Sequence, residues 1–407
     1  MRLLFVASRF PYPPISGERQ RVFSLLQHLS RFHDVTLLSL GSAVADDVAA
    51  LTAQTGVRDV TLVPHPKWRS LWGVFVALVT GRPLQVGYFS STALSTEVAS
   101  MAPNFNAAVF HLIRTSNAWN GTLPAIALLD MCDALSANYE QTIKRGRWWS
   151  PWTWVSAIEA PRTRSFEARE VKRFHLTTLV SAIDAHRFGN ENERIAVMTN
   201  GVNIADVTWN DPALRIGDCI AMVGKMDFFP NQDGAFWFAA HVLPKLPADI
   251  TLKIVGDCSP ALKAKLSRLP RVHVTGRVAS IADACRDCFA GIAPLHVATG
   301  VQTKVLEYFA LGLPSVVSSS VAQGLLPPSR DCVLVADTPD EWVARLQLIR
   351  ASKENASAMA LRARRYVEVH HDWRHIGQAY SDRIDALVAG GGSTHAAPSH
   401  NPRLIPR

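Results

Sequence analysis

The chain has 407 residues, more than one ordinary hydrophobic core organises, so we expect two domains. Its residues are 48% hydrophobic and 19% charged, which excludes a disordered chain and is typical of a globular protein. The formal net charge of +8 favours an anionic partner, either nucleic acid or an anionic membrane surface. No nucleic-acid-binding motif accompanies this charge, so we expect no nucleic acid partner.

The cysteines and the N-terminus indicate the compartment. Cys285 and Cys288 form a C-x-x-C pair without a second pair or a nearby histidine cluster, so we expect two helical thiols rather than a zinc site. The scattered cysteines suit a reducing compartment. The first residues lack the apolar segment and cleavage site of a signal peptide, and no apolar run is long enough to span a bilayer. We therefore expect a cytoplasmic protein.

The N-terminal part of the chain alternates between strand and helix patterns. Residues 2–7 form an apolar run typical of a buried parallel strand, and a Pro-rich loop then ends at Gly17. Apolar residues recur at helical spacing up to residue 29, and a second strand starts at residue 34, which predicts a βαβ unit. No G-x-G-x-x-G fingerprint is present, which disfavours a dinucleotide cofactor.

Further strands are predicted in the same half at residues 59–63, 107–111 and 125–130. Two of them end in polar residues, His111 and Asp130. Ligands of open α/β sheets bind at the carboxyl ends of the strands, so His111 is a candidate functional residue.

Residues 140–175 interleave tryptophan with arginine and lysine. This composition is typical of an interfacial membrane contact, but it also fits a packed helix pair with a solvated basic face. The segment 67–72, followed by an apolar run to residue 80, is a candidate for the same surface. Both interpretations stay open, and an anionic membrane surface contacting residues 144–173 is a predicted partner.

The second half of the chain repeats the alternation after a turn at residues 199–203. We expect strands at 219–224, 250–255, 272–276, 290–295, 315–317 and 332–335, with helices through 235–243 and near 281–288 among the connections. The sequence thus predicts an α/β protein of two Rossmann-like, doubly wound domains that face one another across a cleft. The predicted boundaries are 1–195, 196–375, a C-terminal helix at 376–388 that crosses back to the first domain, and a flexible tail at 389–407.

The stretch from Gly291 to Leu325 carries the clearest functional pattern. An apolar strand leads through a loop with Gly300 into a helix that bears Lys304 and Glu307 on one face. A Gly-containing loop directs free backbone N–H groups and the positive end of the helix dipole at an anion. Lysine suits a diphosphate and a carboxylate suits ribose hydroxyls, so this stretch predicts a nucleotide-sugar pocket.

Several motifs occur in the order found in one family: PYPPISGERQR at 11–21, LLDMCDALSANY at 128–139, VMTNGVN at 197–203, VGKMDFFPN at 223–231, LKIVGD at 252–257, VTGRV at 274–278, and residues 293–325. With these motifs the chain resembles the retaining GT-B-fold glycosyltransferases of family 4, the glycosyl transferases group 1 class. It is most similar to bacterial sugar transferases of exopolysaccharide and exosortase (PEP-CTERM) loci. The resemblance implies transfer from a nucleotide-diphosphate-sugar to a lipid-linked or saccharide acceptor in bacterial surface polysaccharide assembly.

The resemblance also implies residue roles. Glu307 corresponds to the second acid of the family's Glu-x7-Glu signature and would hold the ribose, while Thr299 stands in place of the first acid. Lys225 occupies the position of the family's phosphate-binding arginine. The family's second phosphate-binding lysine is absent from this chain, and Lys304 would supply its positive charge. The implied donor-binding set is Gly17, Gly224, Lys225, Thr299, Gly300, Val301, Gln302, Lys304 and Glu307. The implied catalytic set is His111, Lys225 and Lys304, and the implied acceptor-binding set is Gly17 and Arg114.

For the mechanism we expect front-face transfer without a metal or another cofactor, because no Asp-x-Asp stands in a convincing metal site. The positive groups would stabilise charge on the departing diphosphate. Two alternatives remain: a nucleotide-sugar epimerase with the same GT-B architecture, and a non-catalytic nucleotide-sugar-binding subunit, which Thr299 makes plausible. The expected location is the cytoplasm, peripheral on the inner face of the cell membrane.

Overall fold

The computed structural model describes residues 1–119, 121, 126–145, 150–189, 192–214, 217–298, 300–325 and 331–391. These residues fold as two compact units. The first unit holds the described residues of Met1–Glu140, Trp148–Met198 and Ile376–Arg407, and the second holds those of Gln141–Arg147 and Thr199–His375.

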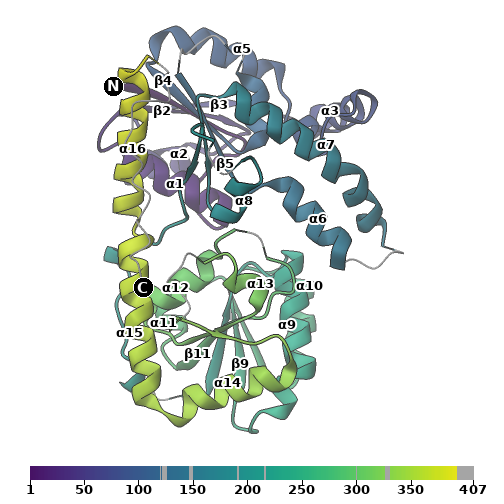
Figure 1. The fold of residues 1–407 in the computed structure, drawn as a ribbon, viewed down its shortest axis with the longest axis vertical. Helices are drawn as coiled ribbons and strands as arrows, with labels where there is room; N and C mark the ends of the chain where they lie inside the picture. Colours follow the sequence, from purple (N-terminus) through teal and green to yellow (C-terminus); the bar gives the residue numbers. More distant parts are fainter. Residues whose placement is uncertain are drawn as a thin grey trace. The chain divides into compact units, whose positions relative to one another are not determined.

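The first unit is built on a seven-stranded parallel sheet of order β3-β2-β1-β4-β5-β6-β7 (Figure 1). The side chains of β1 from Leu3 to Ala7 are fully buried, as expected for a strand covered on both faces. The strands are β1 (Arg2–Ala7), β2 (Asp34–Leu40), β3 (Asp59–Val63), β4 (Ala107–His111), β5 (Ile126–Cys132), β6 (Leu176–Leu179) and β7 (Ile195–Val197).

Helices connect these strands and cover both faces of the sheet (Figure 1). They are α1 (Gly17–Leu29), α2 (Ala45–Thr55), α3 (Lys67–Thr80), α4 (Leu84–Tyr88), α5 (Thr92–Met101), α6 (Leu135–Arg145), α7 (Pro151–Arg173) and α8 (Ala182–His186), with short 3-10 turns at Ala102–Asn104 and Ile113–Ala118. From Ile376 onward, α16 (Trp373–Ala389) also belongs to this unit. Its Ser381 hydroxyl lies 2.8 Å from Nε2 of His33, which holds the helix at the turn between α1 and β2.

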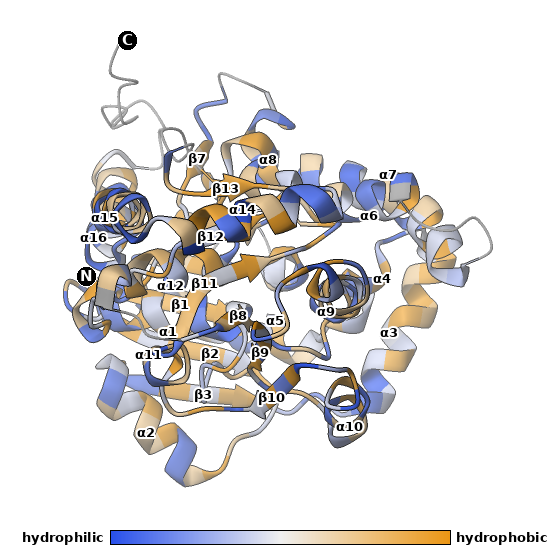
Figure 2. Cartoon of the chain, turned by 90° about the horizontal axis from the view of Figure 1, so that it is seen from below, coloured by the Kyte–Doolittle hydropathy of each residue, from blue (hydrophilic) through white to orange (hydrophobic). Residues whose placement is uncertain are grey.

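The second unit is built on a six-stranded parallel sheet of order β10-β9-β8-β11-β12-β13. Its strands are β8 (Cys219–Val223), β9 (Thr251–Val255), β10 (Val272–Gly276), β11 (Cys288–Ala293), β12 (Ser315–Val317) and β13 (Leu334–Val335). Its helices are α9 (Phe229–His241), α10 (Pro260–Leu266), α11 (Ile281–Ala284), α12 (Thr303–Leu311), α13 (Ser319–Ala322), α14 (Pro339–Ala351) and α15 (Lys353–His370), with 3-10 turns at Ile204–Asp206, Pro212–Leu214 and Leu243–Lys245. The strands of both sheets are largely orange, hence hydrophobic, in Figure 2.

The strand order of each sheet locates its ligand edge. The order reverses between β1 and β4 in the first unit and between β8 and β11 in the second. In open α/β sheets, ligands bind outside the carboxyl ends of the strands at such a reversal. The start of α1 and His111 therefore lie at this edge of the first unit, and Gly224 and the loop before α12 lie at that of the second.

Two sequence-based element predictions are corrected by the structure. The helix expected near 281–288 ends at Ala284, and β11 already begins at Cys288. Cys288 pairs with Cys219 in the neighbouring strand β8, so the end of this segment is part of the sheet and not of the helix. The C-x-x-C cysteines are consequently two buried thiols outside a common helix. The helix expected at 235–243 begins earlier, at Phe229, because Pro230 is well suited to a first helical turn.

The described helices include none that is both long and apolar enough to cross a membrane. In the segment predicted to contact a membrane, Trp152 and Trp154 at the start of α7 are exposed. Residues 146–149 of that segment, with two more of its tryptophans, lie outside the described residues.

Candidate functional site

In the second unit, two glycines bring the ends of β8 and β9 into contact. Gly224 and Gly256 follow these strands with φ of +150° and +141°. A Cβ added to Gly256 would lie 2.1 Å from the carbonyl oxygen of Gly224, so no larger residue fits without moving the backbone. The strand ends therefore present backbone rather than side chains at the ligand edge.

Lys304 brings a buried ammonium group to this same point. Its side chain extends from α12, is only 8% exposed, and Nζ donates a hydrogen bond to the side-chain oxygen of Asn231. Asn231 Nδ2 in turn donates to the carbonyl oxygen of Lys225 at 2.9 Å. A Cβ added to Gly224 would lie 3.3 Å from Lys304 Nζ, which places the ammonium beside the end of β8.

Burial lowers the pKa of Lys304 to about 8, and the carboxylate of Glu307 opposes this shift. A lysine that has given up most of its hydration, yet stays mainly protonated at neutral pH, is suited to meet an anion. Glu307 lies three residues further along α12 and is half-buried, so both groups sit on one face of the helix, as predicted.

The N-terminus of α12 completes this group. Gly300 has φ of +61°. A Cβ added to Gly324 would lie 2.0 Å from the carbonyl oxygen of Gly300, so the two backbones are in close contact. Val301 is buried, and Gln302, the N-cap residue, makes no capping hydrogen bond through its side chain in this structure. The helix dipole and the first backbone N–H groups thus add positive potential beside Lys304.

Tyr308 holds α12 to both central strands of the sheet. Its buried hydroxyl accepts a hydrogen bond from Val223 N at 2.7 Å and donates one to the carbonyl oxygen of Ile292 at 3.1 Å. Gly291 leaves room for the ring, since a Cβ there would lie 2.8 Å from ring atoms. One side chain therefore spans β8 and β11 and fixes where Lys304 and Glu307 lie.

A cavity of about 530 Å³ opens at the same edge of this sheet, beyond β11 and β12. Pro294 and His296 line one side of it, and Ser318 and Asp337 line another. His296 Nδ1 lies 2.8 Å from the carboxylate of Asp233. Of the residues predicted to bind the donor, those that the structure describes do not line this cavity.

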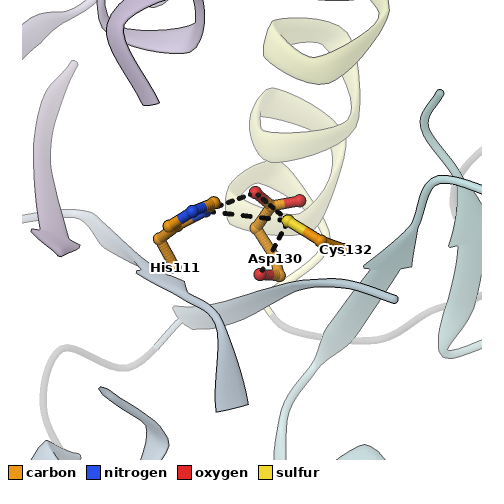
Figure 3. A group of neighbouring side chains, drawn as sticks. All are labelled: His111, Asp130 and Cys132. Atoms are coloured by element: carbon orange, nitrogen blue, oxygen red, sulfur yellow. Dashed lines mark hydrogen bonds and ion pairs between the residues drawn. The ribbon is translucent and has the colours of Figure 1, made fainter. Parts of the chain in front are cut away.

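In the first unit, the carboxylate of Asp130 is the centre of a buried polar cluster. Arg21 binds it with two hydrogen bonds, of 2.9 Å from Nε and 2.7 Å from the second terminal nitrogen. The hydroxyl of Thr178 donates to the same carboxylate at 2.8 Å. His111 Nδ1 lies 2.8 Å from Oδ2, an arrangement drawn in Figure 3.

This geometry sets the protonation of the cluster. Burial alone would raise the pKa of Asp130, but the Arg21 guanidinium and the hydrogen bonds hold it well below its usual range. The ionised carboxylate can only accept, so His111 donates from Nδ1. His111 Nε2 is buried and has no hydrogen-bond partner among the described residues. Its hydrogen-bonding capacity is therefore unused within the described part of the protein.

Cys132 adds a sulfur atom to this cluster, and one potential ligand atom each of His111, Asp130 and Cys132 lies within 4.8 Å of the others. This set does not fit a metal ion, because both oxygens of Asp130 already bind Arg21. Burial also raises the pKa of the Cys132 thiol, whereas metal ligation needs the thiolate. The cluster is better described as a support for His111.

Two arginines meet one glutamate beside this cluster. Glu18 lies 3.8 Å from Arg9 and 3.5 Å from Arg114, and both guanidinium groups stack on the ring of Phe89. Burial would raise the pKa of Glu18, but Arg114, His111 and Arg9 together lower it. One carboxylate thus faces two guanidinium groups. The local excess of positive charge suits an anionic ligand group.

Gly17 is the first residue of α1, behind the N-cap Ser16, whose side chain accepts a hydrogen bond from Arg19 N. A Cβ added to Gly17 would meet nothing within 4 Å. The protein itself therefore does not require glycine at this position.

The structure divides the predicted site residues between the units. Gly224, Gly300, Lys304 and Glu307 come together in the second unit, while Lys225 is exposed at the end of β8. Gly17, His111 and Arg114 belong to the first unit, and Thr299 lies outside the described residues.

Sequence reasoning assigned no role to Arg21, Asn231 or Gly256. A signal for the role of Asp130 was present, since Asp130 and His111 both end predicted neighbouring strands and are register partners in the sheet. For Arg21 and Asn231, no local pattern marks the contact.

The chain was compared with known protein families, sequences and structures. Residues 217–351, from β8 to α14, match the family model described as glycosyl transferases group 1. No curated protein sequence matches the chain. The solved structures that are similar include HepE from Anabaena in complex with UDP and glucose. It is 16% identical with a TM-score of 0.66, and the match covers 95% of this chain and 100% of that chain.

Two further similar structures are sucrose-phosphate synthase from Thermosynechococcus elongatus and WaaG, a glycosyltransferase involved in lipopolysaccharide biosynthesis. The first is 14% identical with a TM-score of 0.69 and coverage of 96% and 100% of the two chains. The second is 14% identical with a TM-score of 0.65 and coverage of 94% and 99%. At these identities the likeness concerns the fold, and it confirms the predicted α/β class and GT-B architecture.

Proposed function

We propose that the chain is a glycosyltransferase that transfers a sugar from a nucleotide-diphosphate-sugar donor, because residues 217–351 match the glycosyl transferases group 1 model and the fold is similar to that of HepE. The acceptor is a lipid-linked intermediate or a saccharide of bacterial surface polysaccharide assembly, and the anomeric configuration is retained. The complex of HepE with UDP-glucose supports the donor class, and the role of WaaG in lipopolysaccharide biosynthesis supports the acceptor class.

The observation that carries the donor assignment is the position of Lys304. Its buried ammonium lies beside the Gly224 backbone and is held by Asn231. The N-terminus of α12 adds its dipole within one turn. We assign the diphosphate to this positive point, with exposed Lys225 as a further contact, and the ribose hydroxyls to the carboxylate of Glu307. The backbone from Gly300 to Gln302 then contacts the sugar-bearing end of the donor.

In the proposed reaction, the bond between the sugar C1 and the diphosphate oxygen breaks, and its electron pair stays on the diphosphate. The acceptor hydroxyl oxygen bonds to C1 on the same face, and its proton passes to the leaving phosphate oxygen. Lys304, Lys225 and the N-terminus of α12 stabilise the charge that accumulates on the diphosphate. This stabilisation is built into the fold, because Tyr308 and Asn231 fix the helix and the ammonium before substrate binds.

Within the first unit, we assign His111 to a hydroxyl of the donor sugar. Asp130 fixes its tautomer, so Nε2 offers a lone pair to that hydroxyl. We assign Arg114 to an anionic group of the acceptor, since Arg9 and Arg114 share the single carboxylate of Glu18. Gly17, with open space where a Cβ would be, lets a ligand approach the start of α1. A lipid-linked acceptor places the enzyme on the cytoplasmic face of the cell membrane.

The test begins with thermal shifts of the purified protein in a panel of UDP- and GDP-sugars. The donor that stabilises the protein is then incubated with and without a lipid-linked acceptor extract. Sugar transfer and nucleotide release that need the acceptor support the proposal, and activity is expected to persist in EDTA. Interconversion of the nucleotide sugar without acceptor would identify an epimerase, and binding without turnover would identify a non-catalytic subunit.

Site variants locate the donor in the same experiments. Lys304→Met and Glu307→Ala are each expected to abolish the donor-induced thermal shift. Lys245→Met is the matched control, because Lys245 is half-exposed and pairs with Asp340 at the surface. If both site variants keep the shift of the unmodified protein, the donor site is assigned wrongly.

A further inference from the structure

Helix α3 exposes an unusual amount of apolar surface for a helix of a globular protein. Trp68, Leu71, Trp72, Phe75 and Val79 are 55–73% exposed. They recur at intervals of three and four residues, so they form one continuous stripe along the helix. Leu78 extends the stripe, and α3 shows orange residues along its length in Figure 2. We call this set of six side chains the α3 stripe.

The opposite face of α3 is packed closely against α4. A Cβ added to Gly73 would lie 2.1 Å from the carbonyl oxygen of Gly87, and Ala77 is buried next to the same glycine. The backbone of α4 is tied to α7 by a hydrogen bond of 2.7 Å from Leu84 N to the buried carboxylate of Glu159. The α3 stripe is therefore held outward by a rigid support rather than exposed by a loose segment.

The charged residues within α3 and next to it along the chain all have one sign. Lys67 and Arg69 lie at the start of α3, Arg82 follows its end, and all three are exposed. Residues 60–96, which include α3 and α4, contain no aspartate or glutamate. Arg69 also stacks on the Trp68 ring at 5.3 Å, so its charge lies at the edge of the apolar surface. An apolar face bordered by cations is complementary to anionic lipid headgroups above acyl chains.

We propose that α3 is a membrane-docking helix that lies in the plane of an anionic bilayer, with the α3 stripe among the upper acyl chains. Its 14 residues extend about 21 Å, too short to span a bilayer, and only one face is apolar. Tryptophan is favoured at this depth, where its ring meets the headgroup boundary. A second copy of this chain is the weaker occupant, because the same cations would then face one another across the contact.

This inference deepens the proposed function by naming the surface that would hold the enzyme at the membrane. It rests on the proposed function only for the purpose of the docking, which is to give the enzyme access to a lipid-linked acceptor. Vesicle binding is measured without donor or acceptor, so its failure would leave sugar transfer untouched. Failure of sugar transfer would likewise leave vesicle binding untouched.

The test is co-sedimentation of the full chain with vesicles of phosphatidylglycerol and phosphatidylethanolamine, compared with vesicles of phosphatidylcholine alone. The unmodified protein is expected to bind the anionic vesicles preferentially and to lose that preference in high salt. Trp72→Ser with Phe75→Ser is expected to weaken binding about tenfold or more, because both rings leave the acyl region. Lys67→Glu with Arg69→Glu is expected to weaken binding to anionic vesicles alone.

The matched control is Leu361→Ser with Val369→Ser, two exposed apolar residues of α15 that should leave vesicle binding unchanged. Melting temperature and donor-induced thermal shift show whether each variant is folded. Equal vesicle binding by the folded Trp72 and Phe75 double variant would overturn the proposal. A dimer that the same variant dissociates, in a protein that does not bind vesicles, would also overturn it and identify a second copy as the occupant.

Discussion

Asp130 Oδ2 and His111 Nδ1 lie 2.8 Å apart although the two residues are 19 positions apart in the chain, and their strands pair in register at these two positions. The same carboxylate neutralises Arg21, which extends to it from α1. Asp130 therefore has two roles that can be tested separately. It compensates a buried guanidinium, which concerns stability, and it fixes the orientation and tautomer of His111, which concerns chemistry.

The contribution of Asp130 to folding stability is tested with Asp130→Asn. This change leaves the Arg21 guanidinium buried without a counter-charge, and we expect a loss of roughly 3 kcal/mol or more in the free energy of unfolding. Urea denaturation measures it. Because the folded pKa of Asp130 is lowered, the carboxylate stabilises the protein above the ordinary pKa of about 4 and ceases to do so as pH falls further. The difference between the variant and the unmodified protein should therefore shrink in acid.

A surface pair supplies the control for this measurement. Asp34 binds Arg58, whose side chain is 62% exposed, and Asp34→Asn is expected to cost less than about 1 kcal/mol. Equal costs for Asp34→Asn and Asp130→Asn would contradict the view that burial makes the Arg21 pair sensitive.

The proposed catalytic role of His111, which Asp130 orients, is tested with His111→Gln. Loss of Nε2, which has no hydrogen-bond partner in the described part of the chain, should lower kcat about 100-fold, while the donor-induced thermal shift is retained. Steady-state kinetics with the identified donor measure the change. His273→Gln, at an exposed position on β10, is the control and should leave kcat unchanged. A full kcat in the His111 variant would remove this residue from the catalytic set.

Lys304 predicts a particular pH dependence of donor binding. Its pKa is lowered to about 8, so raising the pH through this value removes the charge that meets the diphosphate. Donor affinity should fall between about pH 7.5 and 9.5, as measured by calorimetry at constant ionic strength. Lys304→Arg keeps a charge at all these pH values and should move the fall to higher pH. A flat affinity across this range would contradict the assignment.

The same lysine affects the unliganded protein in the opposite direction. Since the folded pKa lies below the ordinary value of 10.5, the unfolded chain binds more protons between the two values. The contribution of Lys304 to stability therefore rises as pH increases from about 8 to the ordinary pKa, in contrast to donor affinity.

Gly256 and Gly17 are expected to be needed for different reasons, Gly256 for the fold and Gly17 for the approach of a ligand. Gly256→Ala should destabilise the second unit by about 2 kcal/mol or more, because the new methyl group collides with the carbonyl of Gly224. Gly17→Ala meets no protein atom, so the melting temperature should be unchanged or slightly raised. We nevertheless expect Gly17→Ala to lower sugar transfer, because a ligand approaches this backbone. Full transfer by a normally stable Gly17 variant would show that no ligand comes close.

Local patterns made much of the fold predictable. The strand at Ala107–His111 was predicted with its observed bounds, because an apolar run between polar loops is a property of neighbouring residues alone. The placement of Lys304 and Glu307 on one helical face was predictable for the same reason, since helical spacing fixes it. The boundary between α11 and β11 was missed, because pairing with β8, rather than local preference, decides where that strand begins.

The sequence by itself determined the repeated βα alternation, the two doubly wound sheets and the loop and helix that carry Lys304, because each depends on periodicity and turn chemistry within a few residues. Only the tertiary structure decided what holds the site residues. Arg21 reaches Asp130 across 109 positions of the chain, and Asn231 reaches Lys304 across 73. Such contacts depend on strand order and register, which bring distant side chains to one edge of a sheet, and no local pattern encodes which of them will meet.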